Sequence, residues 1–410
     1  MAILAFLFRV RIAVVTALGL LTVGFLFLAF YGQRVPVAAM YLSVPSLAIG
    51  ALVAFAHLRH TMLAVLSIIA PLPGMVAAGI FAVPAGLTLA GLVTVYAVAY
   101  VAGAMMSGEI VRRVLDGQPL EAAAQNALGR MLMPVTIAAV TAAVLFVGWM
   151  FRDARMLGFG AAAEVVAASL SVLVVTAFGA TLVPFGEMAI AEANRARERT
   201  EPWLRRLTLV TTPRWALSLT GAALVLATLG AFGAESLAAR SSLIAQPIAI
   251  GASLFLVGMV AFTVARDGRE AVAATLAFVS LALLCLRLWA RAVGHMTLTS
   301  FIEIVCVMTV AMLGAVALLA NARRYRLARE NVGVARLRAI EDVGVSFAYG
   351  VAGAAALVLP WILLHGSMVT LALLFVAGGA AGLIGVPAIA TTIDTLFRRR
   401  RSAEELYGRG

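Results

Sequence analysis

The chain contains no lysine, because all 31 of its basic residues are arginine. This absence excludes a P-loop ATPase, which needs a lysine, and any mechanism that uses a lysine Schiff base or nucleophile. Charge of either sign is scarce: only 12% of the 410 residues are charged, against about 25% in soluble domains. The two cysteines, Cys285 and Cys306, lie in apolar stretches and predict no disulfide framework. The motifs of zinc proteases and serine hydrolases are absent as well. We therefore expect no enzyme, no metal site and no cofactor.

Long apolar segments dominate what remains. Apolar residues make up 63% of the chain, and the mean hydropathy is +1.05. Runs of about 20 apolar residues predict transmembrane helices, so we predict an all-α polytopic membrane protein without room for a separate soluble domain. The predicted spans are 12–31, 36–56, 62–82, 86–107, 131–150, 157–186, 215–233, 243–265, 271–290, 297–322, 343–364 and 368–396.

The arginines predict the orientation of these twelve spans. With the N-terminus in the cytoplasm, 25 arginines fall on the inner side and five on the outer side. This asymmetry follows the positive-inside rule and predicts a bacterial inner-membrane protein with both termini cytoplasmic. It also explains the net charge of +12 without a nucleic-acid partner.

The chain is predicted to consist of two similar halves. A polar stretch around 187–214 separates six spans in 1–200 from six spans and a basic tail in 201–410. In both halves a long basic loop follows the fourth span, and Pro184 and Pro387 mark the ends of the sixth and twelfth spans. Because each half begins and ends inside, we predict parallel six-helix pseudo-repeats.

Four sets of residues form distinctive motifs: Asp116–Ala122, Arg323–Arg326 with Asn331–Gly344, Leu204–Trp215, and the Pro184 and Pro387 span ends. These motifs resemble those of the RND superfamily, and in particular of its hopanoid- and lipid-exporting, MMPL-like branch. The segment from Asp116 to Pro134 resembles that family's amphipathic helix before the fifth span, and 323–344 resembles its second copy. The resemblance implies an RND-like fold and a transporter.

Two departures from that family bear on function. The family's large extracytoplasmic porter domains are replaced by short predicted connections at 31–35 and 234–242. The family's proton relay uses acids in the fourth and tenth spans, and the corresponding positions here are near Val101 and Val316. Both are apolar, so the resemblance does not carry the usual proton coupling over to this chain.

Few ionisable groups lie inside the predicted spans. Glu164 falls in the sixth span and Glu303 in the tenth. Acids inside a bilayer are costly and point to function, so both are candidates for a transport or proton site; the alternative is a carboxyl bonded to a neighbouring helix. Arg287 is a candidate partner for Glu303, or it extends to the membrane surface.

Prolines interrupt the third predicted span. Pro71, Pro73 and Gly74 predict a broken helix that either exposes backbone to a substrate cavity or permits close packing. Tyr96 and Tyr100 in the fourth span are further candidates for lining that cavity.

The basic inner loops predict contact with anionic lipid or with a protein partner. The candidate residues are Arg205, Arg206, Arg323, Arg324 and Arg326.

The sequence thus favours an RND-like inner-membrane transporter of a lipid or other amphiphile, such as a hopanoid or a lipid-linked precursor, that works with or without protein partners. One alternative is a lipid-sensing or scaffold subunit of a membrane complex. Another is a divergent major-facilitator-type transporter of a small solute.

Overall fold

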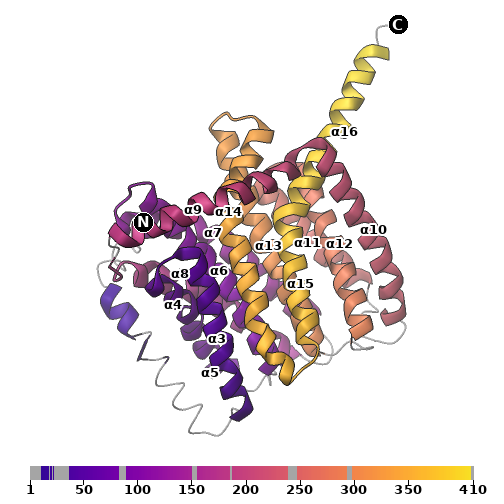
Figure 1. Ribbon diagram of the computed structural model, residues 1–410. Coiled ribbons are helices and arrows are strands. Elements are labelled where there is room, and N and C mark those ends of the chain that lie inside the picture. Colours follow the sequence, from indigo (N-terminus) through magenta and orange to yellow (C-terminus); the bar gives the residue numbers. More distant parts are fainter. Residues whose placement is uncertain are drawn as a thin grey trace. The chain divides into compact units, whose positions relative to one another are not determined.

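The chain folds into long helices. The computed structural model describes residues 11–17, 19–20, 22, 37–82, 89–149, 155–184, 187–238, 247–292 and 298–407. Helices are the only regular elements among these residues, and no strand occurs in them. The elements are α3 (Val37–Leu58), α4 (Thr61–Ile69), α5 (Leu72–Ala82), α6 (Leu89–Leu115), α7 (Leu120–Trp149), α8 (Arg155–Ala180), α9 (Glu187–Thr208), η2 (Leu209–Thr211), α10 (Pro213–Ala238), α11 (Pro247–Ala265), α12 (Gly268–Ala292), α13 (Leu298–Leu327), α14 (Val332–Val358), η3 (Leu359–Leu363), α15 (Met368–Ala380), η4 (Ala381–Gly385) and α16 (Val386–Tyr407) (Figure 1).

The helices have the length and composition of membrane spans. In the described part of the chain, nine helical segments are long and apolar enough to cross a bilayer. The surfaces of α3 and α10 expose large apolar side chains such as Leu52 and Val225, as expected of helices that face lipid. The first predicted span, 12–31, lies mostly outside the described residues, so the total of twelve spans stays a prediction.

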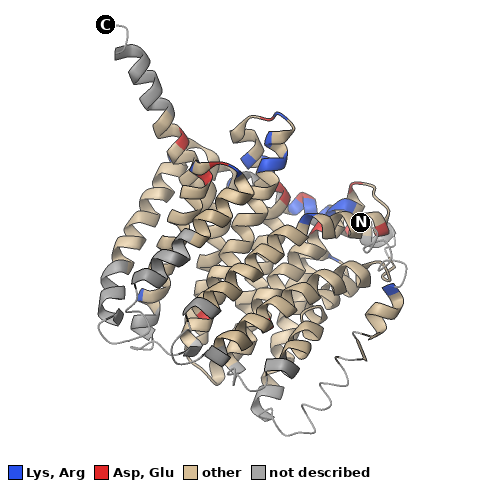
Figure 2. Ribbon diagram, turned by 180° about the vertical axis from the view of Figure 1, so that it is seen from behind, with Lys and Arg blue, Asp and Glu red and all other residues tan. Residues whose placement is uncertain are grey.

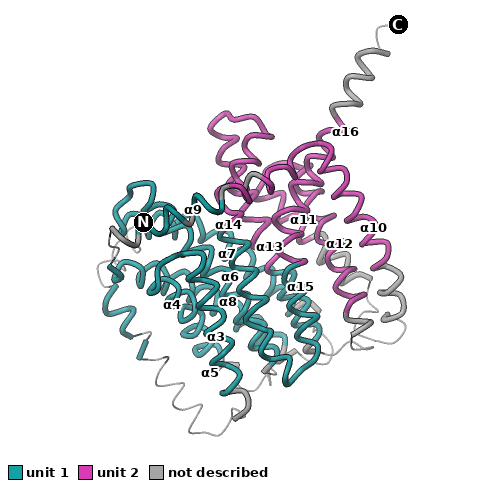
Figure 3. Tube along the Cα trace, in the orientation of Figure 1, with its two compact units in different colours: residues 1–200, 298–309, 346–376 teal, residues 201–297, 310–345, 377–410 magenta. Residues whose placement is uncertain are grey.

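The chain forms two compact units (Figure 3). Unit 1 comprises 1–200, 298–309 and 346–376, and unit 2 comprises 201–297, 310–345 and 377–410. A boundary therefore lies between Thr200 and Glu201, where the two predicted halves meet, but α13, α14 and α15 each pass from one unit to the other.

Unit 1 is built around α6. This helix packs against α3, α4, α7 and α8, and α8 in turn packs against α5 and α7. Small residues allow close approach: a Cβ added to Gly103 of α6 would lie 3.2 Å from the carbonyl oxygen of Ser67. Phe146 of α7 meets Phe301 of α13 edge to face, with ring centroids 6.4 Å apart.

Unit 2 is built around α12, which packs against α10, α11 and α16. At the start of α10, Val210 and Ala216 form a buried cluster with Ala388 of α16. Thr220 and Thr392 share a hydrogen bond of 3.0 Å between α10 and α16. These contacts fix the beginning of α10 against the last span.

Two kinds of turn occur once in each unit. Gly117 after α6 and Arg329 after α13 both adopt positive φ, and in each turn the next amide donates to the carbonyl five residues earlier, at 3.0 and 3.2 Å. Arg59 after α3 and Arg266 after α11 also share a positive φ, with each amide donating to the carbonyl four residues earlier. This recurrence is what two repeats of one helical plan would produce.

Four predicted span boundaries differ from the structure. The amphipathic segments before the fifth and eleventh spans are continuous with those spans, as α7 and α14. The helix of the sixth span ends at Ala180, before Pro184. The twelfth span, however, does not end at Pro387: a π-helical turn at 381–385 accommodates the missing proline N–H, and α16 continues to Tyr407.

Charged residues are segregated along the helices. In each unit taken by itself, most of them lie at one end of the helices, and long stretches beyond carry none (Figure 2). These are the ends that the arginine count assigns to the cytoplasm.

Candidate functional site

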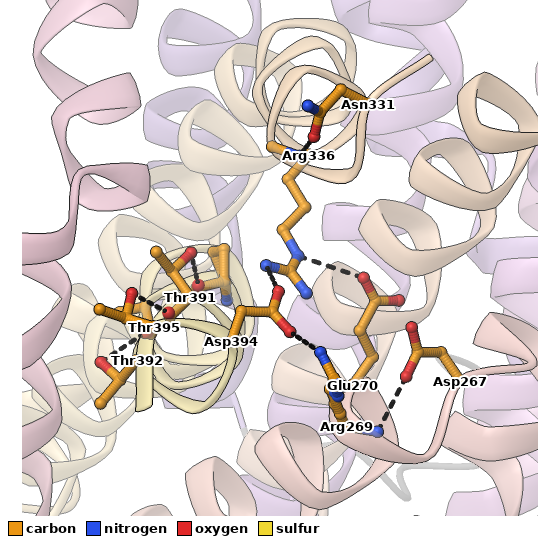
Figure 4. Close-up of polar contacts among 12 residues, drawn as sticks. Asp267, Arg269, Glu270, Asn331, Arg336, Thr391, Thr392, Asp394 and Thr395 are labelled. Carbon is orange, nitrogen blue, oxygen red and sulfur yellow. Dashed lines mark hydrogen bonds and ion pairs between the residues drawn. The ribbon is translucent and has the colours of Figure 1, made fainter. Parts of the chain in front are cut away.

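Six charged side chains form an ion-pair network in unit 2. Figure 4 labels Asp267, Arg269, Glu270, Arg336 and Asp394. The six side chains come from α13, α14, α16 and from the turn and first residues of α12. Three are acids and three are arginines, so the network is balanced in formal charge. The members are Asp267, Arg269, Glu270, Arg326, Arg336 and Asp394.

Glu270 and Asp394 connect the network. The carboxylate of Glu270, with 1% of the side chain exposed, accepts from Arg326 Nη2 at 3.0 Å and from Arg336 Nε at 3.2 Å. Asp394 accepts from Arg336 Nη1 at 2.7 Å and from Arg269 Nη1 at 2.9 Å. Arg336 is only 4% exposed, so its charge depends on these two carboxylates.

The network does not use every donor that it buries. Arg326 Nε and Arg336 Nη2 have no hydrogen-bond acceptor among the described residues. Arg326 Nη1 also pairs with Asp267 at 3.0 Å, and its Nη2 donates to the carbonyl of Ala265. A partly satisfied network is a poor source of stability.

Unit 1 has a smaller cluster after the equivalent span. Glu109 near the end of α6 accepts from Arg112 and Arg113 of its own helix, at 3.0 and 2.8 Å, and from Arg130 of α7 at 3.1 Å. In unit 2 the hydroxyl of Tyr325 donates to Asp342 at 2.6 Å and so joins α13 to α14. A polar side-chain contact thus joins the corresponding helices in both units, α6 to α7 in unit 1 and α13 to α14 in unit 2.

The two predicted transport acids are buried within unit 1. Glu164 of α8 and Glu303 of α13 each expose 2% of their surface. The Oε2 atom of Glu164 has no hydrogen-bond partner among the described residues. Arg287 of α12 donates from Nη1 to the backbone carbonyl of Leu229 in α10.

The prolines of the third span lie at a kink, where two side chains donate to backbone carbonyls. The span is divided into α4 and α5, with a turn at 70–71. The hydroxyl of Tyr96 donates to the carbonyl of Ile68 at 2.7 Å, and Ser171 of α8 donates to that of Ala70 at 2.7 Å. Pro71, Pro73 and Gly74 are all buried. A Cβ added to Gly74 would lie 2.0 Å from the carbonyl oxygen of Ala167, so Gly74 packs α5 directly on α8.

The position of the family's relay acid in the fourth span is packed tightly. Val101 of α6 is fully buried, and its Cγ1 and carbonyl oxygen would each lie 3.2 Å from a Cβ added to Gly350 of α14. One residue earlier, the Tyr100 hydroxyl donates to the carbonyl of Gly50 at 2.9 Å, and its ring lies against Gly353. Val316, the counterpart in the tenth span, is 1% exposed.

The predicted lipid-facing arginines are placed in different surroundings. Arg326 belongs to the ion-pair network, and Arg323 donates to the carbonyl of Val264 at 3.4 Å. Arg206 and Arg324 are exposed, whereas the side chain of Arg205 lies outside the described residues. The structure therefore leaves Arg206 and Arg324 as the more accessible of these candidates.

Sequence reasoning missed two polar arrangements. One is the ion-pair network, although Asp394 lies inside the predicted twelfth span and is an available signal. The other is His57, whose Nε2 lies 3.1 Å from Ser346 Oγ and whose ring stacks on Tyr349 at 4.7 Å. Gly108 of α6 leaves room for this pair, because a Cβ there would lie 2.1 Å from Ser346 Oγ.

Comparison with known proteins informs the fold. No protein-family model matches the chain, and no curated protein matches it. Among solved structures it is similar to SecDF, a translocon-associated membrane protein, from Thermus thermophilus, at 13% identity and a TM-score of 0.59. That match covers 88% of this chain and 62% of SecDF. A structure of SecDF in a super-membrane-facing form matches at 15% identity and a TM-score of 0.61, covering 90% and 63%.

The chain spans about three fifths of the length of these solved structures. At such low identity the likeness concerns the fold alone. SecDF is a member of the RND superfamily, and the likeness favours that plan over the major-facilitator plan. The chain is thus a multi-pass membrane protein with an RND-like fold.

Proposed function

We propose that this chain is an RND-like inner-membrane transport protein for a lipid or another amphiphile, of the hopanoid or lipid-linked precursor class. In this proposal it has twelve spans in two parallel repeats, both termini are cytoplasmic, and the extracytoplasmic domains are replaced by short connections. In this proposal it works with or without protein partners.

The observation that carries the proposal is Glu164. Its carboxyl group is buried in a membrane span, 2% exposed, with Oε2 unpartnered among the described residues. Such a group is costly in a bilayer and points to an ion or proton site. Glu303, equally buried in the same unit, is the second candidate for coupling transport to an ion gradient.

The first experiment identifies what the protein binds. The protein is extracted with its bilayer in polymer discs and analysed by native mass spectrometry. We expect one amphiphile to remain bound in a fixed ratio. If instead no lipid is retained selectively and other subunits remain, the transporter proposal is contradicted in favour of a scaffold.

The second experiment tests coupling. The protein is placed in liposomes with a fluorescent analogue of the retained amphiphile, and transbilayer movement is followed with and without a proton gradient. We expect Glu164→Gln to abolish the gradient-dependent part of the rate. Glu192→Gln, an exposed acid on α9, is the matched control and retains the full rate. Equal gradient-dependent rates for Glu164→Gln and the unaltered protein would contradict the coupling role.

One observation favours a second candidate function. Where the family carries its relay acid in the fourth span, Val101 packs on Gly350 without space for a carboxylate pair. A non-transporting subunit that senses lipid or organises a membrane complex has no need of a relay. The native mass spectrum separates the two candidates, since this one requires stable protein partners and no substrate.

A further inference from the structure

The last span contains, within unit 2, residues that favour a helix bend. A π-helical turn at Ala381–Gly385 is followed at once by Pro387, which cannot donate a backbone hydrogen bond. Beyond it, the hydroxyls of Thr391, Thr392 and Thr395 donate to carbonyls four residues earlier, at 2.8, 3.0 and 2.8 Å. π turns, prolines and back-bonded threonines are each causes of helix bending.

The two sides of this bend are held differently. On the π turn, a Cβ added to Gly382 would lie 2.5 Å from the carbonyl oxygen of Ala311, so this turn is packed on α13. Beyond the bend, α16 contacts α10 through the buried Ala388 and through a hydrogen bond of Thr392. Its ionic attachment is Asp394, which joins Arg269 of α12 and Arg336 of α14 (Figure 4). The guanidinium of Arg269 also lies 5.0 Å from the ring centroid of Phe397.

Ionic attachment is a poor way to fix a helix permanently. A buried ion pair often stabilises no more than apolar residues of the same volume, because two charges must leave water. Here Arg336 also buries an Nη2 without an acceptor among the described residues. Ion pairs differ from apolar packing in one useful respect: they separate at defined atoms and re-form in one register.

We propose that the Asp394 ion pairs are a lock that holds α16 against α12 and α14, and that the π turn and Pro387 are the hinge about which α16 swings when the lock opens. The closed form is the one observed. The device requires no particular substrate and stands apart from the role of Glu164.

The test measures whether a buried face of α16 becomes accessible. The two native cysteines are replaced by alanine, and Ala390→Cys, at a position 1% exposed on α16, serves as the reporter. Labelling by a membrane-impermeant maleimide is timed in open membrane fragments. Leu396→Cys, at a position 56% exposed, gives the rate of an unprotected thiol.

With the lock intact, the reporter at position 390 should react slowly. Asp394→Asn should accelerate it roughly tenfold or more, since breaking a buried pair from one side is strongly unfavourable to the closed form. Arg336→Gln should act in the same direction from the other side. Glu330→Gln, which removes an ion pair with Arg338 outside the network, is the matched control and should leave the rate unchanged.

A further variant tests the hinge. A Cβ at Gly385 would meet nothing closer than 3.6 Å, from Ala277 Cβ, so Gly385→Ala fits the closed form. Alanine favours regular helix over glycine, so it should slow labelling in the Asp394→Asn background by several-fold. If Gly385→Ala leaves the labelling rate in the Asp394→Asn background unchanged, the hinge lies elsewhere.

Two results would overturn the proposal. One is a reporter at position 390 that reacts equally slowly in Asp394→Asn and in the protein with its lock intact. The other is acceleration that extends to a Val264→Cys reporter on α11, at a position fully buried. That second result would mean that the ion pairs hold unit 2 together as a whole and that α16 has no movement of its own.

Discussion

Replacement of Glu270 by glutamine should destabilise unit 2 more than any surface change of charge. Glu270 is 1% exposed and accepts one hydrogen bond from Arg326 and one from Arg336. Glutamine keeps the shape and one acceptor oxygen but removes the charge. The network then holds three guanidinium groups and two carboxylates, with the excess positive charge centred on Arg336, which is 4% exposed.

The magnitude follows from what each arginine retains. Arg336 keeps Asp394 at 2.7 Å, and Arg326 keeps Asp267 at 3.0 Å. Each arginine keeps one carboxylate partner, so the loss in the free energy of unfolding should be smaller than the roughly 3–5 kcal/mol of a completely broken buried pair. The amide oxygen can accept from one arginine, but the amide NH2 cannot accept from the other. One charge-assisted bond of about 1.5–3 kcal/mol is therefore lost and the second is weakened, which gives about 2–4 kcal/mol.

The measurement is reversible unfolding in mixed micelles of dodecyl maltoside and dodecyl sulfate, followed by tryptophan fluorescence. Glu330→Gln is the reference, because its ion pair with Arg338 is more open to solvent: the two side chains are 19% and 52% exposed. Solvent screening makes such a pair worth less than a buried one. In a double-mutant cycle, Glu270→Gln with Arg336→Gln should cost less than the two single changes added together. A free-energy loss for Glu270→Gln equal to that of Glu330→Gln would refute the reasoning.

Three further predictions concern packing in unit 1, each measured by thermal unfolding in detergent. Gly74→Ala should lower the unfolding temperature and cost about 1–3 kcal/mol or more of stability, because the new Cβ would lie 2.0 Å from the Ala167 carbonyl oxygen. A higher unfolding temperature, the usual effect of alanine in a helix, would contradict this packing. Gly353→Ala should do the same, since its Cβ would lie 2.3 Å from the Tyr100 ring, and an unchanged temperature would show that the ring moves freely. Tyr96→Phe should cost about 1 kcal/mol by removing the donor at the proline kink, and no loss would mean that water replaces it.

Hydropathy predicts the helices of this chain well, because a membrane span must satisfy its own backbone and therefore appears as a long apolar run. It places the segment 62–82 correctly and identifies Pro71 as the site of the kink. Boundaries were less predictable. Nothing apolar distinguishes the start of α7 at Leu120, since the amphipathic segment and the span are one helix.

The ion-pair network was beyond the sequence for a different reason. Its partners lie far apart in the chain, as with Arg269 and Asp394, which are 125 residues apart. Their pairing depends on which helices become neighbours, and apolar periodicity does not specify that. Arg326 illustrates the same limit, because an arginine on an amphipathic segment has the same pattern whether it contacts lipid headgroups or a carboxylate of α12.

The distribution of polar groups in unit 1 bears on how an RND-like fold works without the family's relay acid in the fourth span. Around the middle of α6 the polar side chains are neutral and bonded to backbone carbonyls, as with Tyr96 to Ile68 and Tyr100 to Gly50. Such bonds hold helices in register but carry no charge across the membrane. The charged residue of this helix that is buried, Glu109, lies near its end among three arginines. Among the described residues of unit 1, an unpartnered carboxylate oxygen lies on α8, at Glu164. Under the proposed transport function, coupling through this unit would therefore involve the packing of α8 against α5, α6 and α7.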